Sequence, residues 1–263
     1  MKSGSVKYFI IDPISRRIYL RIAWSITQLL TRNRYGVVTD GEFIYSLGGY
    51  IGGTTANVGM LKIKPYASDH ISSLALTNPF TLPSWNGFVF DNHLYAISDQ
   101  VMDVVNLSTN TKVYKNIIMP RNPVLRVLHK NYIYSILPRV DLTKPDRIKL
   151  ISKYNLLDET IEYIELDEEW EFNDAGGGVW GRGCSLGDDI YFIAGNSTIG
   201  ASFYKYNDVT NKVTEIPVPD PFNMWLSSTS CFPCVLNGKI YFYSFIVIGD
   251  VPEARIWEYT PEE

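Results

Sequence analysis

The sequence predicts an all-β fold built from repeated hairpins, and three observations lead to that prediction. Aromatic residues make up 14% of the chain and include 18 tyrosines, which suits strands because aromatic side chains pack well on a pleated surface. Short apolar runs recur along the chain, and each contains an aliphatic residue followed by tyrosine. Pairs of turn-forming residues precede most of these runs, as expected for two-residue hairpin loops.

The length and charge of the chain indicate the number of domains and exclude some kinds of partner. With 263 residues and 46% hydrophobic content, the chain can bury one substantial core, so a single domain over residues 1–263 is expected. A formal net charge of -4 and the lack of a Lys/Arg-rich run argue against nucleic acid as a partner. No apolar run reaches the 18 residues of a membrane-spanning helix.

The N-terminal sequence and the cysteine count bear on location. The first apolar run is short and ends at Asp12, so it does not resemble a signal peptide. An odd count of 3 cysteines fits a reducing compartment. We therefore expect a cytoplasmic protein, with an extracellular or surface-attached location as the alternative if a leader is missing.

Five copies of the tyrosine motif set the repeat. The anchoring residues are separated by 50, 39, 57 and 50 residues, a spacing typical of propeller blades. The copies with a strong turn signal carry Asp-Gly, Asp-Asn, Gly-Asp or Asn-Gly before the second strand, and the turn at residues 129–131 is weaker. The anchors are Tyr45, Tyr95, Tyr134, Tyr191 and Tyr241.

A second hairpin accompanies most copies. It consists of an apolar strand, a polar turn and another strand, in residues 11–18, 105–113, 153–161 and 205–213. Two hairpins give four strands per unit, and such thin units must stack on neighbours around an axis to bury both faces. The sequence therefore predicts a β-propeller.

The predicted ring has five four-stranded blades, and an N-terminal strand completes the last one. That strand exchange is expected because an open seam would leave backbone groups and apolar faces exposed. A ring of six blades or an incomplete ring is the alternative. The units are an N-terminal outer hairpin at 6–23, then about 34–80, 84–119, 123–170, 179–218 and 226–260.

The repeats resemble kelch repeats of the galactose oxidase and kelch-like superfamily. Kelch units carry an apolar strand that ends in a glycine pair; here Gly48-Gly49 is complete and Ala194-Gly195 is partial. The tryptophan that often follows the outer turn is replaced by an aliphatic residue. The resemblance covers nearly the whole chain and implies a propeller that binds partners through loops at one end of the ring.

The histidines and cysteines are the candidate residues for catalysis or for binding a cofactor. The 3 histidines, His70, His93 and His129, do not form a recognisable triad or copper ligand set, and we expect His93 and His129 at the surface. Cys231 and Cys234 have one metal-like spacing without a second pair, so structural thiols are favoured. No cofactor is expected.

Two further alternatives concern sugars and phosphates. Glycosidases need two paired carboxylates, and the candidates cannot be paired from the sequence: Asp99, Asp103, Asp141 and Asp174. The glycine-rich residues 48–53 lack the following helix and lysine of a phosphate loop. We interpret that glycine pair as structural.

The residues expected to contact a partner lie where one unit leads into the next. Aromatic and arginine side chains are common interface anchors, although the two loop tryptophans at 85 and 225 have an alternative role in packing between blades. The predicted partner-binding residues are Arg34, Tyr35, Trp85, Arg126, Trp180, Arg182 and Trp225. We expect a non-catalytic module that binds a peptide or protein, with a carbohydrate-binding or glycoside-hydrolysing propeller as the alternative.

Overall fold

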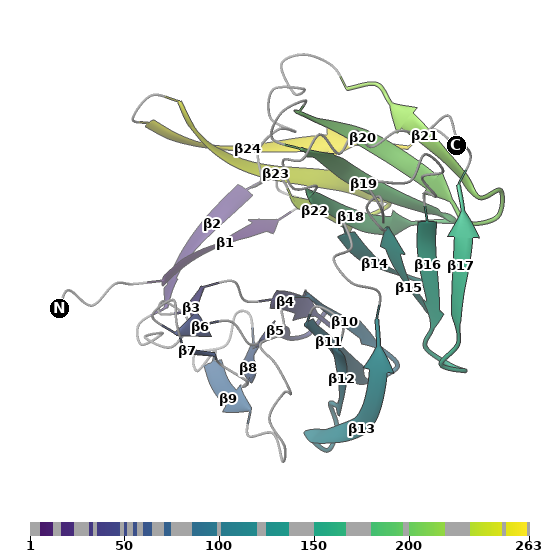
Figure 1. The fold of residues 1–263 in the computed structure, drawn as a ribbon. Coiled ribbons are helices and arrows are strands. Elements are labelled where there is room, and N and C mark those ends of the chain that lie inside the picture. The colour runs from purple at the N-terminus through teal and green to yellow at the C-terminus, as the bar shows by residue number, and fades with distance from the viewer. Residues whose placement is uncertain are drawn as a thin grey trace. The chain divides into compact units, whose positions relative to one another are not determined.

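The structure is a computed structural model of residues 1–263. It describes residues 6–12, 17–23, 32–33, 36–47, 50–51, 55–56, 60–64, 71–74, 86–98, 101–119, 125–136, 150–166, 180–196, 200–218, 232–248 and 251–261. These residues are strands and turns (Figure 1). Among them, no helix is long and apolar enough to cross a membrane.

The chain forms two compact units, and the first covers Met1–Met119. Its strands pair in antiparallel fashion into two four-stranded sheets and two smaller ones. Blade I contains β4 (Gly36–Thr39), β5 (Ile44–Leu47), β8 (Met60–Ile63) and β9 (Ile71–Leu74), and blade II contains β10 (Asn86–Phe90), β11 (His93–Ser98), β12 (Val101–Asn106) and β13 (Thr111–Ile118). The smaller sheets are β1 (Val6–Asp12) with β2 (Arg17–Ala23), and β3 (Arg32–Asn33), β6 (Tyr50–Ile51) and β7 (Thr55–Ala56).

The second unit covers Pro120–Glu263 and contains three sheets. Blade III consists of β14 (Leu125–His129), β15 (Tyr132–Ile136), β16 (Leu150–Asn155) and β17 (Ile161–Glu165). Blade IV consists of β18 (Trp180–Leu186), β19 (Asp189–Asn196), β20 (Gly200–Asn207) and β21 (Lys212–Ile216). Blade V has three strands, β22 (Phe232–Leu236), β23 (Lys239–Ile248) and β24 (Val251–Tyr259).

Within each unit, neighbouring blades meet along their first strands. Strand β4 lies against β10 in the first unit, while β14 lies against β18 and β18 against β22 in the second. Apolar side chains from facing sheets fill the space between blades. This arrangement confirms the predicted all-β fold of the β-propeller class.

The blade count and the closure differ from the prediction. Four sheets have four strands, and the fifth has three among the described residues, so the prediction of five four-stranded blades was wrong by one sheet. The N-terminal strand β1 pairs with β2 along its whole length, in a two-stranded sheet. It therefore does not serve as the expected last strand of blade V in the described pairing. A local hairpin needs no long-range strand exchange, which explains this preference.

The repeated tyrosines occupy one equivalent position in all five blades. Each lies on the second strand, and each pairs with a residue near the middle of the first strand. On the third strand a lysine faces three of them: Lys62 opposite Tyr45, Lys153 opposite Tyr134 and Lys205 opposite Tyr191. Val104 and Glu258 take that place opposite Tyr95 and Tyr241. The sequence repeat is thus a true structural repeat.

The inner turns have the left-handed backbone that the sequence predicted. In blades II to V two residues join the first and second strands, whereas four residues, 40–43, join them in blade I. Asp91 and Asn92 both have positive φ, of 45° and 56°, as a type I′ turn requires. In the weaker copy, Lys130 takes the left-handed conformation with φ of 56°.

The outer turns share a capping asparagine that ends the third strand. Asn106 and Asn207 each accept hydrogen bonds from the backbone N–H groups two and three residues later, and Asn155 accepts one from Leu157. The Asn155 amide also receives a hydrogen bond from Asn131, and the Asn207 amide donates to Asp189. These contacts join the inner and outer turns of one blade.

Candidate functional site

The predicted partner-binding residues precede the first strand of a blade or lie within its first three residues. Arg34, Tyr35, Trp85 and Trp225 lie outside the described residues. Trp180 begins β18, and its side chain is likewise not described. The structure describes the side chains of Arg126 and Arg182.

The two arginines lie on the first strands of neighbouring blades. Arg126 is the second residue of β14, pairs with Ser135 and is 8% exposed. Arg182 is the third residue of β18, pairs with Ile193 and is exposed. Strands β14 and β18 lie against each other. Arg182 is therefore accessible to a partner, whereas Arg126 is mostly enclosed.

The register places the arginines on different faces of their sheets. On β14, Val127 pairs with the repeated Tyr134, and Arg126 is one position before Val127. On β18, Cys184 pairs with the repeated Tyr191, and Arg182 is two positions before Cys184. Because side chains alternate between faces along a strand, Arg126 shares its face with Ser135 and not with Val127. The structure brings the two strands together without placing the two guanidinium groups at equivalent positions.

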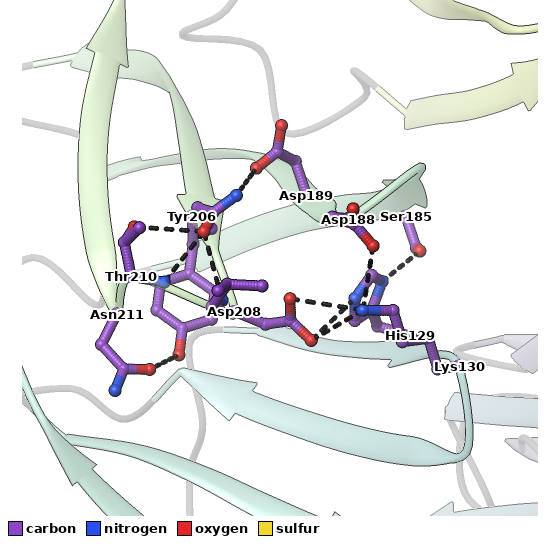
Figure 2. Close-up of polar contacts among 11 residues, drawn as sticks. His129, Lys130, Ser185, Asp188, Asp189, Tyr206, Asp208, Thr210 and Asn211 are labelled. Atoms are coloured by element: carbon purple, nitrogen blue, oxygen red, sulfur yellow. Dashed lines mark hydrogen bonds and ion pairs between the residues drawn. The ribbon is translucent and has the colours of Figure 1, made fainter.

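A polar cluster that the sequence did not predict lies between blades III and IV (Figure 2). His129 ends β14 and contacts Ser185 of β18 and Asp208 of the turn between β20 and β21. Lys130 forms ion pairs with Asp188 and Asp208, both with a distance of 3.1 Å. We call these five residues the His129 cluster. Histidine, lysine and carboxylates from two blades thus meet at one end of their first strands.

The geometry assigns the tautomer of His129. A carboxylate only accepts hydrogen bonds, so the Nε2–H of His129 donates to Asp208 Oδ2 at 3.2 Å. The Ser185 hydroxyl then donates to the Nδ1 atom of His129 at 2.6 Å. A neutral imidazole offers one donor and one acceptor, and both are used here.

Burial and the neighbouring carboxylate shift the pKa of His129 in opposite directions. The side chain of His129 is fully buried, and this burial lowers its pKa below the ordinary value, while the Asp208 carboxylate partly offsets that effect. Hydrogen bonds to Asp188 and Asp208 raise the pKa of the Lys130 ammonium. The Tyr134 ring packs edge-on against the imidazole with a centroid distance of 5.7 Å, and burial raises the pKa of its phenol. The net direction therefore favours the neutral imidazole.

Ser185, His129 and Asp208 are hydrogen-bonded in the order found in a catalytic triad of serine, histidine and aspartate. Such a relay activates a nucleophile only where substrate can reach the serine and the imidazole edge. His129 is fully buried, and the side chain of Asp208 is 9% exposed. The enclosed histidine makes the arrangement a contact between blades. The expectation that His129 lies at the surface was wrong.

The other residues considered for catalysis or metal binding are aspartates, histidines and cysteines. Asp103 is buried and forms an ion pair with Lys112 at 2.7 Å, so it is not a free carboxylate. The Nδ1–H of His93 donates to the Asp91 backbone carbonyl at 2.7 Å, and the Asn106 amide lies 3.4 Å from its Nε2 atom. Cys184 and Cys234 are free thiols. Asp99, Asp141, Asp174, Cys231, His70 and the Gly48-Gly49 pair lie outside the described residues.

No metal centre is found in the part of the chain that the structure describes. Among those residues, no group of three or more histidine, cysteine, aspartate or glutamate side chains could hold a metal ion. Desolvation of the thiol raises the pKa of Cys184, to about 12, and also raises the pKa of Cys234. A raised pKa disfavours the thiolate that metal binding requires.

Comparisons with known proteins support the fold. No family model and no curated protein match the chain. The solved structure of YjhT matches with 14% sequence identity, covers 82% of this chain and 74% of its own, and has a TM-score of 0.54. The extracellular domain of the one-component system BT4673 from B. thetaiotaomicron matches with 13% identity over 86% of this chain at a TM-score of 0.49, and the chain spans 26% of the length of that domain. At such identity the likeness to YjhT supports the propeller fold and identifies no ligand.

Proposed function

We propose that the protein is a non-catalytic binding module that holds a peptide or protein partner at the end of the blades where the first strands begin. The observation that carries the proposal is the position of Arg182, which is exposed near the start of β18. Arginine is enriched among interface anchors because its planar guanidinium combines several donors with an apolar stem. In the sequence, the predicted aromatic residues Tyr35, Trp85 and Trp225 come before the first strands of other blades.

The resemblance to kelch repeats is part of the same proposal. Kelch-like rings bind partners through loops at one end, and the five equivalent tyrosines support a repeat of that kind. The enclosure of His129 and the ion pair of Asp103 also favour binding over hydrolysis. We propose a cytoplasmic location as well, because the two described cysteines are free thiols; imaging of a tagged chain in its source cell tests it.

The test compares partner capture by wild type, Arg182→Ala and Lys212→Ala. Lys212 is a matched control because it is cationic, exposed and located on β21, the outer strand of the same blade. We expect Arg182→Ala to weaken capture from the source cell by about tenfold or more, as loss of an interface anchor does. Lys212→Ala should capture the same partners as wild type.

Two outcomes would contradict the proposal. If Arg182→Ala kept every partner with wild-type affinity, the start of β18 would not be the binding surface. If the protein instead hydrolysed a chromogenic glycoside, or bound only glycans on an array, the carbohydrate alternative would replace a protein partner. A far-ultraviolet circular dichroism spectrum equal to that of wild type would show that each variant is folded.

A further inference from the structure

The His129 cluster bridges two blades that are otherwise joined by apolar packing. Leu125 and Val127 of blade III and Phe192 and Tyr206 of blade IV belong to one buried hydrophobic cluster. At the turn end of the same interface, His129 reaches Ser185 and Asp208 of the neighbouring blade. The bridge therefore consists of hydrogen bonds that depend on the proton state of one imidazole.

The bridge fits a neutral imidazole and does not fit a protonated one equally well. In the neutral form, Ser185 donates to Nδ1 and Nε2–H donates to Asp208. A second proton would turn Nδ1 into a donor. The Ser185 hydroxyl would then have to rotate, accept from Nδ1 and find another acceptor for its own hydrogen within a packed interface. Because Ser185 is half-buried, the hydroxyl has few other acceptors, and a donor left without one is unfavourable.

Charged groups from both blades surround the imidazole. Asp208 and, more weakly, Asp188 favour the second proton, whereas the Lys130 ammonium, which forms ion pairs with both carboxylates, opposes it. From β15, the ring of Tyr134 packs edge-on against the imidazole. From β18, Ser185 presents a hydroxyl. Two carboxylates thus act against burial and a lysine, and burial, the largest of these effects, gives a net direction that disfavours the charged imidazole.

We propose that the His129 cluster is an acid-sensitive latch between blades III and IV. The latch is closed while His129 is neutral and loosens when the imidazole takes up a second proton. Because β14 and β18 also carry Arg126 and Arg182, the latch fixes the two strands from which the arginines project. The latch does not depend on the proposed binding function, since it concerns contacts within the chain.

The direction of the pH effect follows from linkage. In the unfolded chain, a histidine has a pKa of about 6.5. The pKa of His129 is lower than this in the folded protein. The unfolded chain therefore binds more protons than the folded protein as the pH falls below that value. The stabilisation is fully present above about 6.5 and is lost progressively towards the folded pKa.

The experiment compares the thermal midpoint of wild type and His129→Gln between pH 8 and pH 5. Glutamine keeps one donor for Asp208 and one acceptor for Ser185 and does not titrate. His70 and His93 remain in both proteins, so their contributions cancel in the difference. We expect wild type to lose more thermal stability than His129→Gln as the pH falls. Equal losses in the two proteins would overturn the latch.

A second measurement does not require the glutamine variant to fold. The three histidines of wild type can be titrated by nuclear magnetic resonance of their ring protons, and Ser185→Ala identifies the His129 signal through its shift. We expect the His129 signal to titrate below the ordinary histidine value. A midpoint at or above that value would also overturn the latch.

Discussion

At the scale of single residues, one turn shows how an unfavourable conformation is retained. Lys130 has positive φ, which a side chain with a Cβ rarely adopts, and other inner turns use glycine, asparagine or aspartate there. Its ammonium joins Asp188 and Asp208, two carboxylates of the neighbouring blade. The contact between blades accounts for a lysine where the backbone alone would favour asparagine.

Two variants of Lys130 separate the backbone from the charge. Lys130→Ala loses the ion pairs and keeps the strained conformation, whereas Lys130→Asn loses the ion pairs but tolerates that conformation. We expect the thermal midpoint to fall more in Lys130→Ala than in Lys130→Asn. Sodium chloride should reduce the stability of wild type more than that of either variant because salt screens ion pairs. A lower midpoint in the asparagine variant would contradict this account.

At the scale of elements, the first strands set how closely neighbouring blades approach. A Cβ added at Gly183 of β18 would lie 2.7 Å from Val127 Cγ2 and 3.1 Å from the Tyr191 carbonyl oxygen. At the equivalent Gly87 of β10, an added Cβ would lie 2.3 Å from Leu47 Cδ1. Both glycines permit contact between a first strand and the preceding blade of the same unit.

Substitution of Gly183 tests this close approach. We expect Gly183→Ala to lower the free energy of unfolding by about 1–3 kcal/mol, as overpacking of a core does. Val127 is stiff because it is β-branched, so it cannot move aside easily. The double variant with Val127→Ala should lose less than the sum of the single variants, measured by urea denaturation. Strict additivity would contradict the proposed contact.

At the scale of the whole molecule, stability is shared between neighbouring blades. Phe203 of blade IV and Phe242 of blade V pack in a T-shaped contact with ring centroids 4.9 Å apart. Both rings are fully buried. Since each blade buries its faces only against the adjacent blades, loss of one interface should affect both sheets that form it.

Hydrogen exchange of Phe242→Ala measures that coupling. We expect a loss of about 3–5 kcal/mol in the free energy of unfolding, typical of a buried phenylalanine. Amide exchange should accelerate in β19 and β20 as well as in β23. Val209→Ala, at an exposed turn position, should leave exchange in these strands unchanged. Acceleration confined to blade V would contradict nearest-neighbour coupling.

Local sequence signals predicted the repeat well because hairpins are local structures. The tyrosine positions, the turn pairs and the outer asparagine turns follow from residues close together in the chain. The His129 cluster was missed because it joins residues that lie 56 and 79 positions apart. The one available signal was the replacement of a turn-forming residue by Lys130. The incomplete last sheet was missed because strand order at a seam depends on long-range pairing.

The last hairpin has a consequence for the behaviour of the protein in solution. In the described pairing, β24 hydrogen-bonds to β23 alone, and it is 9 residues long. An open backbone of that length can recruit a strand from another molecule and so begin aggregation. The sequence of this strand includes Pro252, Glu253 and Arg255, and proline and charged residues are the types that oppose such recruitment at a sheet edge. The composition of β24 therefore disfavours self-assembly through this strand.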